Sequence, residues 1–256
     1  MLLAIDIGNT NVKLGVYDAA VLRHSWRLKS DAQKMPDEYG VLLASLLNMA
    51  GLATKDMQQA AICSSVPPLV GTFIEVCQRF CGITPLVVGA GVKTGMKVLY
   101  EDPRAVGADR IAGAVAGHHK YGGPIIIADC GTASVFDAIT RDGEYLGGAI
   151  APGMQLSADA LVSRTAMLRR IEMVSPKGAI GRNTVHAMQS GIIFGYVGLV
   201  KELVARFKSE LGDDARVIGT GGLASVIARA GEVFDVLEPD LTLEGLRLIH
   251  EMNQDS

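Results

Sequence analysis

Two segments of the chain place an aspartate, a glycine and a hydroxyl-bearing residue directly after an apolar run. Residues 6–10 read DIGNT and follow the run 2–5, and residues 129–132 read DCGT and follow the run 124–128. Glycine lets backbone amides approach a phosphate without a Cβ in the way, and asparagine and threonine add donors. An aspartate is repelled by phosphate, but it can hold Mg²⁺ or its waters. Both segments therefore indicate turns that bind nucleotide phosphates.

A single Asp-x-Gly segment would be an ordinary turn after a strand, and two copies weaken that interpretation. Lys13 could reach a β- or γ-phosphate, although a lysine on a strand is about as often only solvent-facing. The cluster 219–222, GTGG, suits close approach of the backbone to adenine or ribose. The sequence has no GxxxxGK[ST] loop and no GxGxxG turn opening a helix after the first strand, so the P-loop and Rossmann signatures are missing.

The composition predicts a folded protein with no basic surface for binding polyanions such as nucleic acids. The chain has 256 residues, of which 49% are hydrophobic and 20% charged, enough for one large domain or two smaller ones. Its net charge is −3 and no block of lysine and arginine stands out, so we expect no nucleic-acid partner.

The N-terminus and the apolar runs predict a cytoplasmic protein. The start lacks a basic region and Asp6 interrupts its apolar run, unlike a signal peptide. The apolar run 191–200 is too short to span a membrane, and we expect no membrane partner. No zinc-ligand spacing accompanies the cysteines, and we interpret all four as small core residues in a reducing compartment: Cys63, Cys77, Cys81 and Cys130.

The hydrophobic pattern predicts strands alternating with helices, which is typical of the α/β class. We expect strands at 2–7, 12–17, 21–28, 60–64, 86–88, 124–128, 135–139, 145–150 and 217–218. We expect helices at 38–50, 67–80, 107–120, 153–163, 184–209, after 222 and at 241–252.

The arrangement of strand, Asp-x-Gly turn and strand occurs twice along the chain. This repeat predicts two similar halves with a cleft between them. We place the boundary near residues 116–123. The N-terminal half, 1–117, then holds the first phosphate turn and the GADR segment, and the C-terminal half, 118–256, holds the second turn and the adenosine loop.

Further motifs cover essentially the whole chain. They are DIGNTNVKLGVY at 6–17, VGADR at 106–110, DCGTASVFD at 129–137, GGAIAPGM at 147–154, RTAML at 164–168, IGRNT at 180–184, AMQSG at 187–191, GTGGLA at 219–224 and LEGL at 243–246. In this combination the chain resembles the type III pantothenate kinases of the acetate kinase, sugar kinase, heat-shock ATPase and actin superfamily. The resemblance implies two actin/hexokinase-like (ribonuclease H-like) α/β halves with a nucleotide cleft between them.

The activity that this resemblance implies is ATP-dependent phosphorylation of pantothenate to 4′-phosphopantothenate, the first step of coenzyme A biosynthesis. It makes Asp109 the general base, since a positioned carboxylate can accept the proton of a primary alcohol during phosphoryl transfer. The substrate residues that it implies are Tyr100, Gly107, Ala108, Asp109, Arg110 and Thr184. The ATP residues that it implies are Asp6, Ile7, Gly8, Asn9, Thr10, Asn11, Val12, Lys13, Gly131, Thr132, Gly219 and Gly221.

Metals and partners follow from the same resemblance. It implies Mg²⁺ at Asp6, held through water, and a monovalent cation, K⁺ or NH₄⁺, near Asp129. It also implies a homodimer with the substrate pocket at the interface. The small-residue stretches 107–117 and 190–198 are compatible with the close helix packing of such an interface.

Several of these residues also have ordinary structural interpretations. Without the resemblance, Asp109 and Arg110 at the start of a helix would be a favourable cap and a surface pair. Tyr100 would be a half-buried strand aromatic, and Thr184 a helix cap.

The sequence departs from the family pattern at two places. Val135 stands where a threonine is usual, which puts any hydrogen bond of that threonine in doubt, and the neighbouring Ser134 would face the other side of the strand. Arg169 and Arg170 stand where a proline is common.

Two other functions compete with this one. A different kinase of the superfamily, acting on a sugar or carboxylate, would share both Asp-x-Gly turns but would not need the GADR segment. A regulator without enzyme activity should have lost the base or the first aspartate. Asp6, Asp109 and Asp129 are all present, which argues against a regulator.

Overall fold

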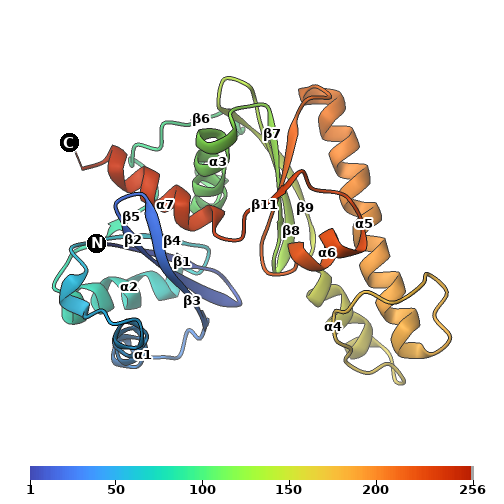
Figure 1. Cartoon of the computed structure of the whole chain (residues 1–256), viewed down its shortest axis with the longest axis horizontal. Coiled ribbons are helices and arrows are strands. Elements are labelled where there is room, and N and C mark those ends of the chain that lie inside the picture. Colours follow the sequence, from blue (N-terminus) through green and yellow to red (C-terminus); the bar gives the residue numbers. More distant parts are fainter. Residues whose placement is uncertain (255–256) are drawn as a thin grey trace. The chain divides into compact units, whose positions relative to one another are not determined.

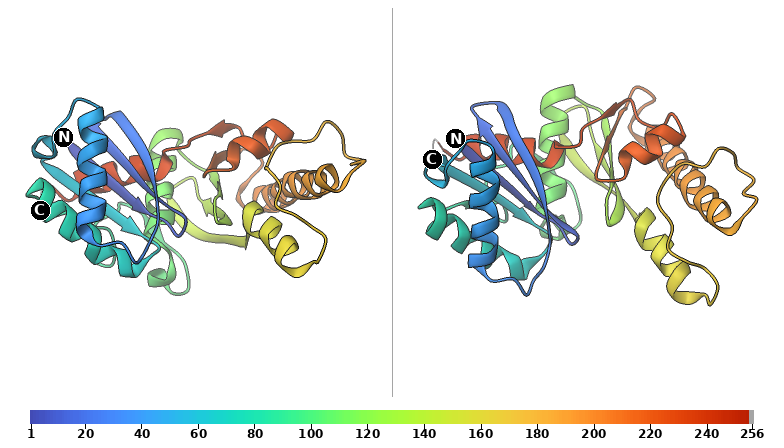
Figure 2. Two further views of the ribbon diagram at one scale, coloured as in Figure 1. Left: turned by 90° about the horizontal axis from the view of Figure 1, so that it is seen from below. Right: turned by 60° about the horizontal axis from the view of Figure 1, so that its bottom comes forward.

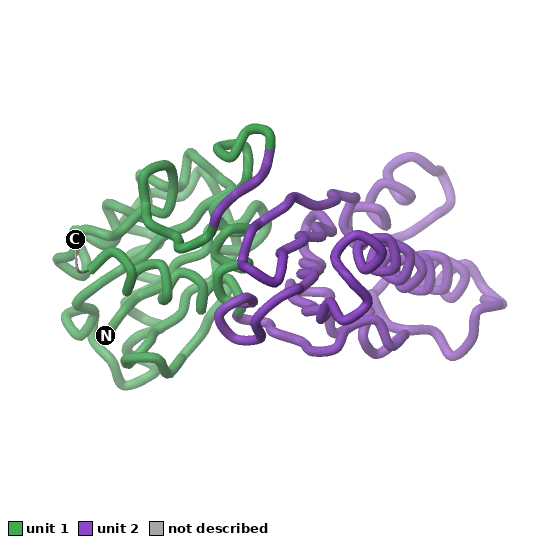
Figure 3. The backbone as a smooth tube through the Cα atoms, turned by 90° about the horizontal axis from the view of Figure 1, so that it is seen from above, with its two compact units in different colours: residues 1–96, 101–116, 241–256 green, residues 97–100, 117–240 purple. Residues whose placement is uncertain are grey.

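The computed structural model describes residues 1–254 and divides the chain into two compact units (Figure 3). Unit 1 comprises Met1–Met96, Glu101–Ala116 and the residues from Leu241 onward, and unit 2 comprises Lys97–Tyr100 and Gly117–Asp240. The halves expected along the sequence, 1–117 and 118–256, place the C-terminal helix differently. This helix packs on the sheet of unit 1, although it follows unit 2 in the chain.

Unit 1 is built on a five-stranded mixed sheet of order β3-β2-β1-β4-β5. The first three strands form an antiparallel meander, and β4 and β5 continue the sheet in parallel with β1. The strands are β1 (Leu2–Ile7), β2 (Asn11–Asp18), β3 (Val21–Lys29), β4 (Gln59–Ser64) and β5 (Leu86–Val87). The helices are α1 (Pro36–Met49), α2 (Pro67–Val76), α7 (Leu241–Met252) and the part of α3 (Ala108–Tyr121) that precedes residue 117, with short helical turns at Thr54–Asp56, Cys77–Cys81 and Pro103–Ala105.

Alternation along the strands decides which side chains enter the main core of unit 1. Leu3, Ile5 and Ile7 of β1 are fully buried on one face of the sheet, where α1 and α2 pack (Figure 1). Tyr39 of α1 and Phe73 of α2 lie in the same core, with ring centroids 4.7 Å apart. The even-numbered residues of β1, Asp6 among them, are therefore directed to the opposite face.

That opposite face is covered by α7, which lies against β1, β2 and β4 (Figure 2). Leu243, Leu246 and Ile249 of this helix are fully buried. Gly245 brings the backbones of α7 and α3 together, because a Cβ at this position would lie only 1.9 Å from the carbonyl oxygen of Ala112. The contact leaves no room for a side chain, so α3 is held in place through a glycine.

Unit 2 contains a six-stranded sheet of order β11-β10-β7-β8-β9-β6. Strands β7, β8 and β9 form an antiparallel meander, and β10 and β11 continue in parallel with β7. The strands are β6 (Lys97–Val98), β7 (Ile125–Cys130), β8 (Ala133–Ile139), β9 (Glu144–Pro152), β10 (Arg216–Thr220) and β11 (Val236–Leu237). Read from β9 to β11, this order repeats that of unit 1 from β3 to β5, so the expected α/β class with two similar sheets is confirmed.

Three helices of unit 2 pack on its sheet and on one another: α4 (Met154–Arg164), α5 (Thr184–Leu211) and α6 (Ala224–Ala230). The long helix α5 begins after Asn183, whose Oδ1 accepts a hydrogen bond from the backbone N–H of His186 at 2.8 Å. Its Ile193 and Tyr196 share a core with Phe136 of β8. Within residues 1–254, no helix is both long enough and apolar enough to cross a membrane.

The structure departs from the predicted elements at a few short segments. Strands β6 and β11 were missed because two residues carry no periodicity. Helix α2 was expected to reach residue 80, but its α-helical part ends at Val76 and a π-helical turn follows, ended by Gly82 with a φ of 71°. All four cysteines are free, with three buried and only Cys81 half-buried, which agrees with their interpretation as core residues.

We predict that Gly245→Ala destabilises the protein by roughly 1–3 kcal/mol, because the new methyl group would force the backbones of α7 and α3 apart. The matched control is Gly113→Ala on α3, where a Cβ would meet only Leu241 Cδ2 at 3.9 Å. The control should be neutral or stabilising by up to about 1 kcal/mol, since alanine favours a helix over glycine. Urea unfolding of both variants measures the difference. Equal stability of the two variants would contradict the packing assigned to Gly245.

Candidate active site

The first predicted phosphate turn joins β1 to β2 in unit 1. The Gly8 backbone N–H donates to the carbonyl oxygen of Asn11 at 3.0 Å, which closes the turn. Ser30 anchors it from the end of β3: its backbone N–H donates to Thr10 O at 3.0 Å and its hydroxyl donates to Gly8 O at 2.5 Å. The side chains of Asn9, Thr10 and Asn11 remain exposed. The turn is thus held through its backbone atoms, while residues 9–11 lie at the protein surface.

Three polar side chains share the sheet face next to this turn. Asp6 lies in register with Lys13 on the antiparallel strand β2 and with Cys63 on the parallel strand β4. Their neighbours along each strand point into the core under α1 and α2, so these three point the other way. The Cys63 thiol donates to Asp6 Oδ1 with an S···O distance of 3.5 Å. The face therefore combines an acid, a base and a neutral donor.

Asp109, the predicted general base, lies close enough to Asp6 for the two carboxylates to repel each other. Burial, followed by the negative charge of Asp109, raises the pKa of Asp6 from 3.8 to about 6, while Lys13 and the Cys63 hydrogen bond act in the opposite direction. Part of the Asp6 surface is still exposed, but protein atoms surround its carboxylate densely. An acid pair of this kind is suited to a divalent cation and to proton transfer.

The position of the Asp109 carboxylate depends on Gly107. Asp109 lies in the first turn of α3, and its Oδ1 accepts a hydrogen bond from the backbone N–H of Arg110 at 2.9 Å. A Cβ on Gly107 would lie 2.4 Å from the same oxygen. The carboxylate therefore folds back over residue 107, and residues 107–110 are all half-buried. The segment is a positioned acid rather than an exposed surface pair.

The second predicted phosphate turn joins β7 to β8 in unit 2. The Gly131 backbone N–H donates to Ala133 O at 3.0 Å, and the Gly153 N–H donates to Thr132 O at 3.0 Å. The side chain of Thr132 is exposed. Asp129 lies in register with Val135 on β8, the position where the family pattern has threonine, so this cross-strand neighbour offers no hydroxyl.

The glycine cluster 219–222 lies directly beside this second turn. Strands β10 and β7 are parallel, with Thr220 opposite Asp129. Gly221 has a φ of 88°, and a Cβ there would lie 2.3 Å from Asp129 Oδ1. The Leu223 N–H donates to Cys130 O at 3.0 Å. Residues far apart in the sequence are thus brought together, and only glycine fits between the cluster and the carboxylate.

The two remaining predicted substrate residues, Tyr100 and Thr184, belong to unit 2. Tyr100 follows β6, and Thr184 lies in α5. Tyr100 packs its ring against Gly147 of β9. Thr184 was interpreted as a possible helix cap; the cap is Asn183, and Thr184 is the first residue of α5. It borders an open groove of about 650 Å³ that Leu161 and other residues of unit 2 also line. Neither contact by itself identifies a ligand for Tyr100 or Thr184.

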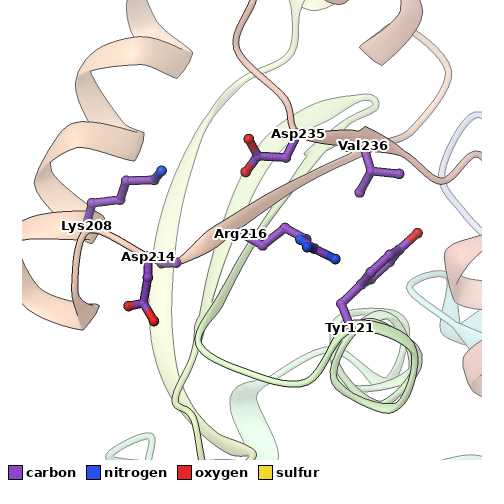
Figure 4. Close-up of a pocket in the computed structure, with 7 residues that line it drawn as sticks. Tyr121, Lys208, Asp214, Arg216, Asp235 and Val236 are labelled. Carbon is purple, nitrogen blue, oxygen red and sulfur yellow. The ribbon is translucent and has the colours of Figure 1, made fainter.

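A different hollow of unit 2, of about 550 Å³, contains none of the predicted site residues (Figure 4). Lys208 and Arg216 line it together with Asp214 and Asp235, so its charges balance. The guanidinium of Arg216 lies over the ring of Tyr121, 5.2 Å from the centroid. Without a net charge or a glycine turn, this hollow is a poor match for nucleotide phosphates.

Comparison with known proteins gives a consistent assignment. A family model described as "Type III pantothenate kinase" matches residues 2–206. The protein named Type III pantothenate kinase from Dehalococcoides mccartyi (strain CBDB1) is 52% identical over 253 residues, which cover 99% of this chain and 96% of that protein.

Solved structures share the fold at low sequence identity. A conserved putative Baf family transcriptional activator from Campylobacter jejuni has a TM-score of 0.63 at 18% identity, covering 99% of this chain and 100% of that chain. A putative 2-dehydro-3-deoxygalactonokinase protein from Sinorhizobium meliloti has a TM-score of 0.59 at 12% identity, covering 100% of this chain and 98% of that chain. These likenesses confirm the actin/hexokinase-like fold class and nothing further. The match in sequence over nearly the whole length shows more: this chain belongs to the type III pantothenate kinase family.

Proposed function

We propose that this chain transfers the γ-phosphoryl group of ATP to the primary hydroxyl of pantothenate, giving 4′-phosphopantothenate for coenzyme A biosynthesis. The observation that carries the proposal is the 52% identity, over 99% of the chain, to a protein named Type III pantothenate kinase. The acid pair of unit 1 supports it, because phosphoryl transfer from a magnesium nucleotide uses one carboxylate near the metal and another near the nucleophile.

Asp109 is the proposed general base. Its carboxylate accepts the hydroxyl proton of pantothenate while the hydroxyl oxygen forms a bond to the γ-phosphorus. The bond from that phosphorus to the bridging oxygen breaks, and ADP leaves with the electron pair. The contacts of Gly107 and of the Arg110 N–H support this role, since they fix the carboxylate. The residues proposed to bind pantothenate are Gly107, Ala108 and Arg110 of unit 1 and Tyr100 and Thr184 of unit 2.

The proposed ATP residues lie in both units. In unit 1 they are the first turn and its flanking strand residues, 6–13. In unit 2 they are Gly131 and Thr132 of the second turn, with Gly219 and Gly221 at the adenosine. Two features support this assignment: side chains in both turns are exposed, and glycine lets the backbone approach the nucleotide closely.

The proposed divalent cation is Mg²⁺, which when bound neutralises phosphate charge. Asp6 fits as its protein partner, directly or through water, since a cation would relieve the repulsion between Asp6 and Asp109. Residues 1–254 contain no group of three or more histidine, cysteine or acidic side chains that could hold a metal.

The remaining partners are also proposals. K⁺ or NH₄⁺ is placed near Asp129, whose carboxylate lies against Gly221. A homodimer is supported by the partly apolar groove at the start of α5, where Leu161 is 42% exposed. A cytoplasmic location, and the lack of nucleic-acid and membrane partners, stay predictions from the sequence.

The proposed function is tested by incubating the purified protein with ATP, Mg²⁺ and pantothenate, with and without K⁺, and quantifying 4′-phosphopantothenate by mass spectrometry. We expect product that requires both Mg²⁺ and K⁺. A folded protein that binds ATP and forms no product from pantothenate would overturn the proposal, and a panel of sugar and carboxylate acceptors would then identify its substrate.

We predict that Asp109→Asn lowers kcat about 10²- to 10⁴-fold, the usual contribution of a general base, while nucleotide affinity changes little. The same assay measures kcat, and calorimetry measures binding of a non-hydrolysable ATP analogue. Asp142→Asn, which removes an exposed charge from a turn of unit 2, is the matched control and should retain wild-type activity. Full activity of the Asp109 variant would remove this residue as the base.

We predict that Gly107→Ala lowers kcat roughly tenfold or more with little loss of stability, because the new methyl group displaces the Asp109 carboxylate from its position over residue 107. Steady-state kinetics and thermal melting measure the two effects. The matched control is Gly71→Ala in α2, where a Cβ meets nothing within 4 Å. Unchanged kcat in the Gly107 variant would contradict this prediction, because it would mean that moving the Asp109 carboxylate has no effect on catalysis.

We predict that Asp6→Asn abolishes activity yet stabilises the metal-free protein at high pH. The pKa of Asp6 is raised from 3.8 to about 6 in the folded state, so ionisation opposes folding progressively above pH 3.8 and fully above pH 6. The variant should gain up to about 3 kcal/mol at pH 8 and almost nothing near pH 4. Urea unfolding with EDTA at both pH values measures this gain. A variant less stable than wild type at pH 8 would contradict the burial assigned to Asp6.

A further inference from the structure

The carboxyl end of β4 runs beside the first phosphate turn and has no role in the function proposed above. β4 is parallel to β1 and in register with it, so that Cys63 lies next to Asp6 and Ser64 next to Ile7. Side chains in register on neighbouring strands point to the same face. Cys63 therefore belongs to the acid face of unit 1 and not to the core under α1 and α2.

The contacts of this strand end reach both parts of the turn. Cys63 Sγ lies 3.5 Å from Asp6 Oδ1, with the thiol as donor. Ser65 continues the ladder, since its backbone N–H donates to Ile7 O at 3.0 Å. Its hydroxyl oxygen also accepts from Asn9 Nδ2 at 3.4 Å. The end of β4 thus contacts the aspartate and the asparagine of the same turn.

The thiol is chemically suited to hold a carboxylate without competing for its metal. Cys63 has no exposed surface. Its thiol is a weak, uncharged hydrogen-bond donor, and the structure directs it at Asp6 Oδ1. A neutral sulfur is a poor ligand for Mg²⁺, which prefers oxygen. Cys63 can therefore fix one carboxylate oxygen and leave the other to a cation.

We propose that Cys63 is a positioning residue for phosphoryl transfer, which holds the Asp6 carboxylate through an S–H···O hydrogen bond from β4. This inference rests on the proposed function, because it gives Asp6 the metal-binding role assigned there. It adds a residue that is required for the geometry of the metal site and that touches neither substrate nor metal.

The test compares Cys63→Ala, which removes the donor, with Cys63→Ser, which keeps one. Cys77→Ala is the matched control, since Cys77 is equally buried in unit 1 but lies in the core under α1 and α2. We expect Cys63→Ala to lower kcat roughly three- to tenfold, as for the loss of one hydrogen bond of ordinary strength from a weak donor, and to raise the Mg²⁺ concentration for half-maximal activity. KM for pantothenate should change less than about twofold, and the serine variant should recover most of kcat.

Calorimetric binding of a non-hydrolysable ATP analogue, with Mg²⁺ and with EDTA, gives a readout that does not need activity. The gain in affinity due to Mg²⁺ should be smaller for Cys63→Ala than for the wild type, the serine variant and Cys77→Ala. The inference is overturned if Cys63→Ala behaves like Cys77→Ala in both measurements, or if serine fails to rescue a folded protein. A wild type inactive on pantothenate would sink the proposed function, while the binding comparison would still decide the role of Cys63.

Discussion

The central constraint on the candidate site of unit 1 is the unfavourable environment of the Asp6 carboxylate, which is enclosed by protein atoms and repelled by Asp109. Burial and like charge both raise the pKa of Asp6, and both oppose folding at neutral pH. Lys13 and Cys63 act the other way and offset part of this effect. An acid pair in such surroundings does not stabilise the fold, and this supports the proposal that the pair serves a catalytic site.

The rest of unit 1 places these groups by simple geometric rules. Alternation along β1 sends Ile5 and Ile7 into the core and Asp6 to the opposite face. Helix α7 covers that face, and Gly245 lets it approach α3 at backbone distance. Because Asp109 lies in the first turn of α3, the packing of α7 against α3 helps to determine where the second carboxylate lies. The candidate site and the main hydrophobic core of unit 1 thus lie on opposite faces of the same sheet.

Unit 2 repeats the strand order of unit 1, but different neighbouring residues position its aspartate, Asp129. Asp129 lies at the end of β7 with Thr220 in register on one side and Val135 on the other. Gly221, in a left-handed conformation, occupies the space beside the carboxylate. The conserved feature between the units is the strand order with an aspartate at the end of the first strand. The neighbours of that aspartate differ, and so do the ions proposed for each.

The sequence by itself determined the α/β class, the two Asp-x-Gly turns and most element positions, since apolar periodicity and glycine turns are local signals. Asp109 became the candidate base only through the resemblance to a kinase family, because its residue type and position alone indicate a helix cap. It misplaced the cap of α5 by one residue, and it missed β6 and β11, which are too short to show a period. Only the tertiary structure decided that Cys63 faces Asp6, that Gly221 abuts Asp129 and that the C-terminal helix belongs to unit 1. These contacts join residues far apart in the chain through strand register and helix packing, and no local pattern encodes the register between distant strands.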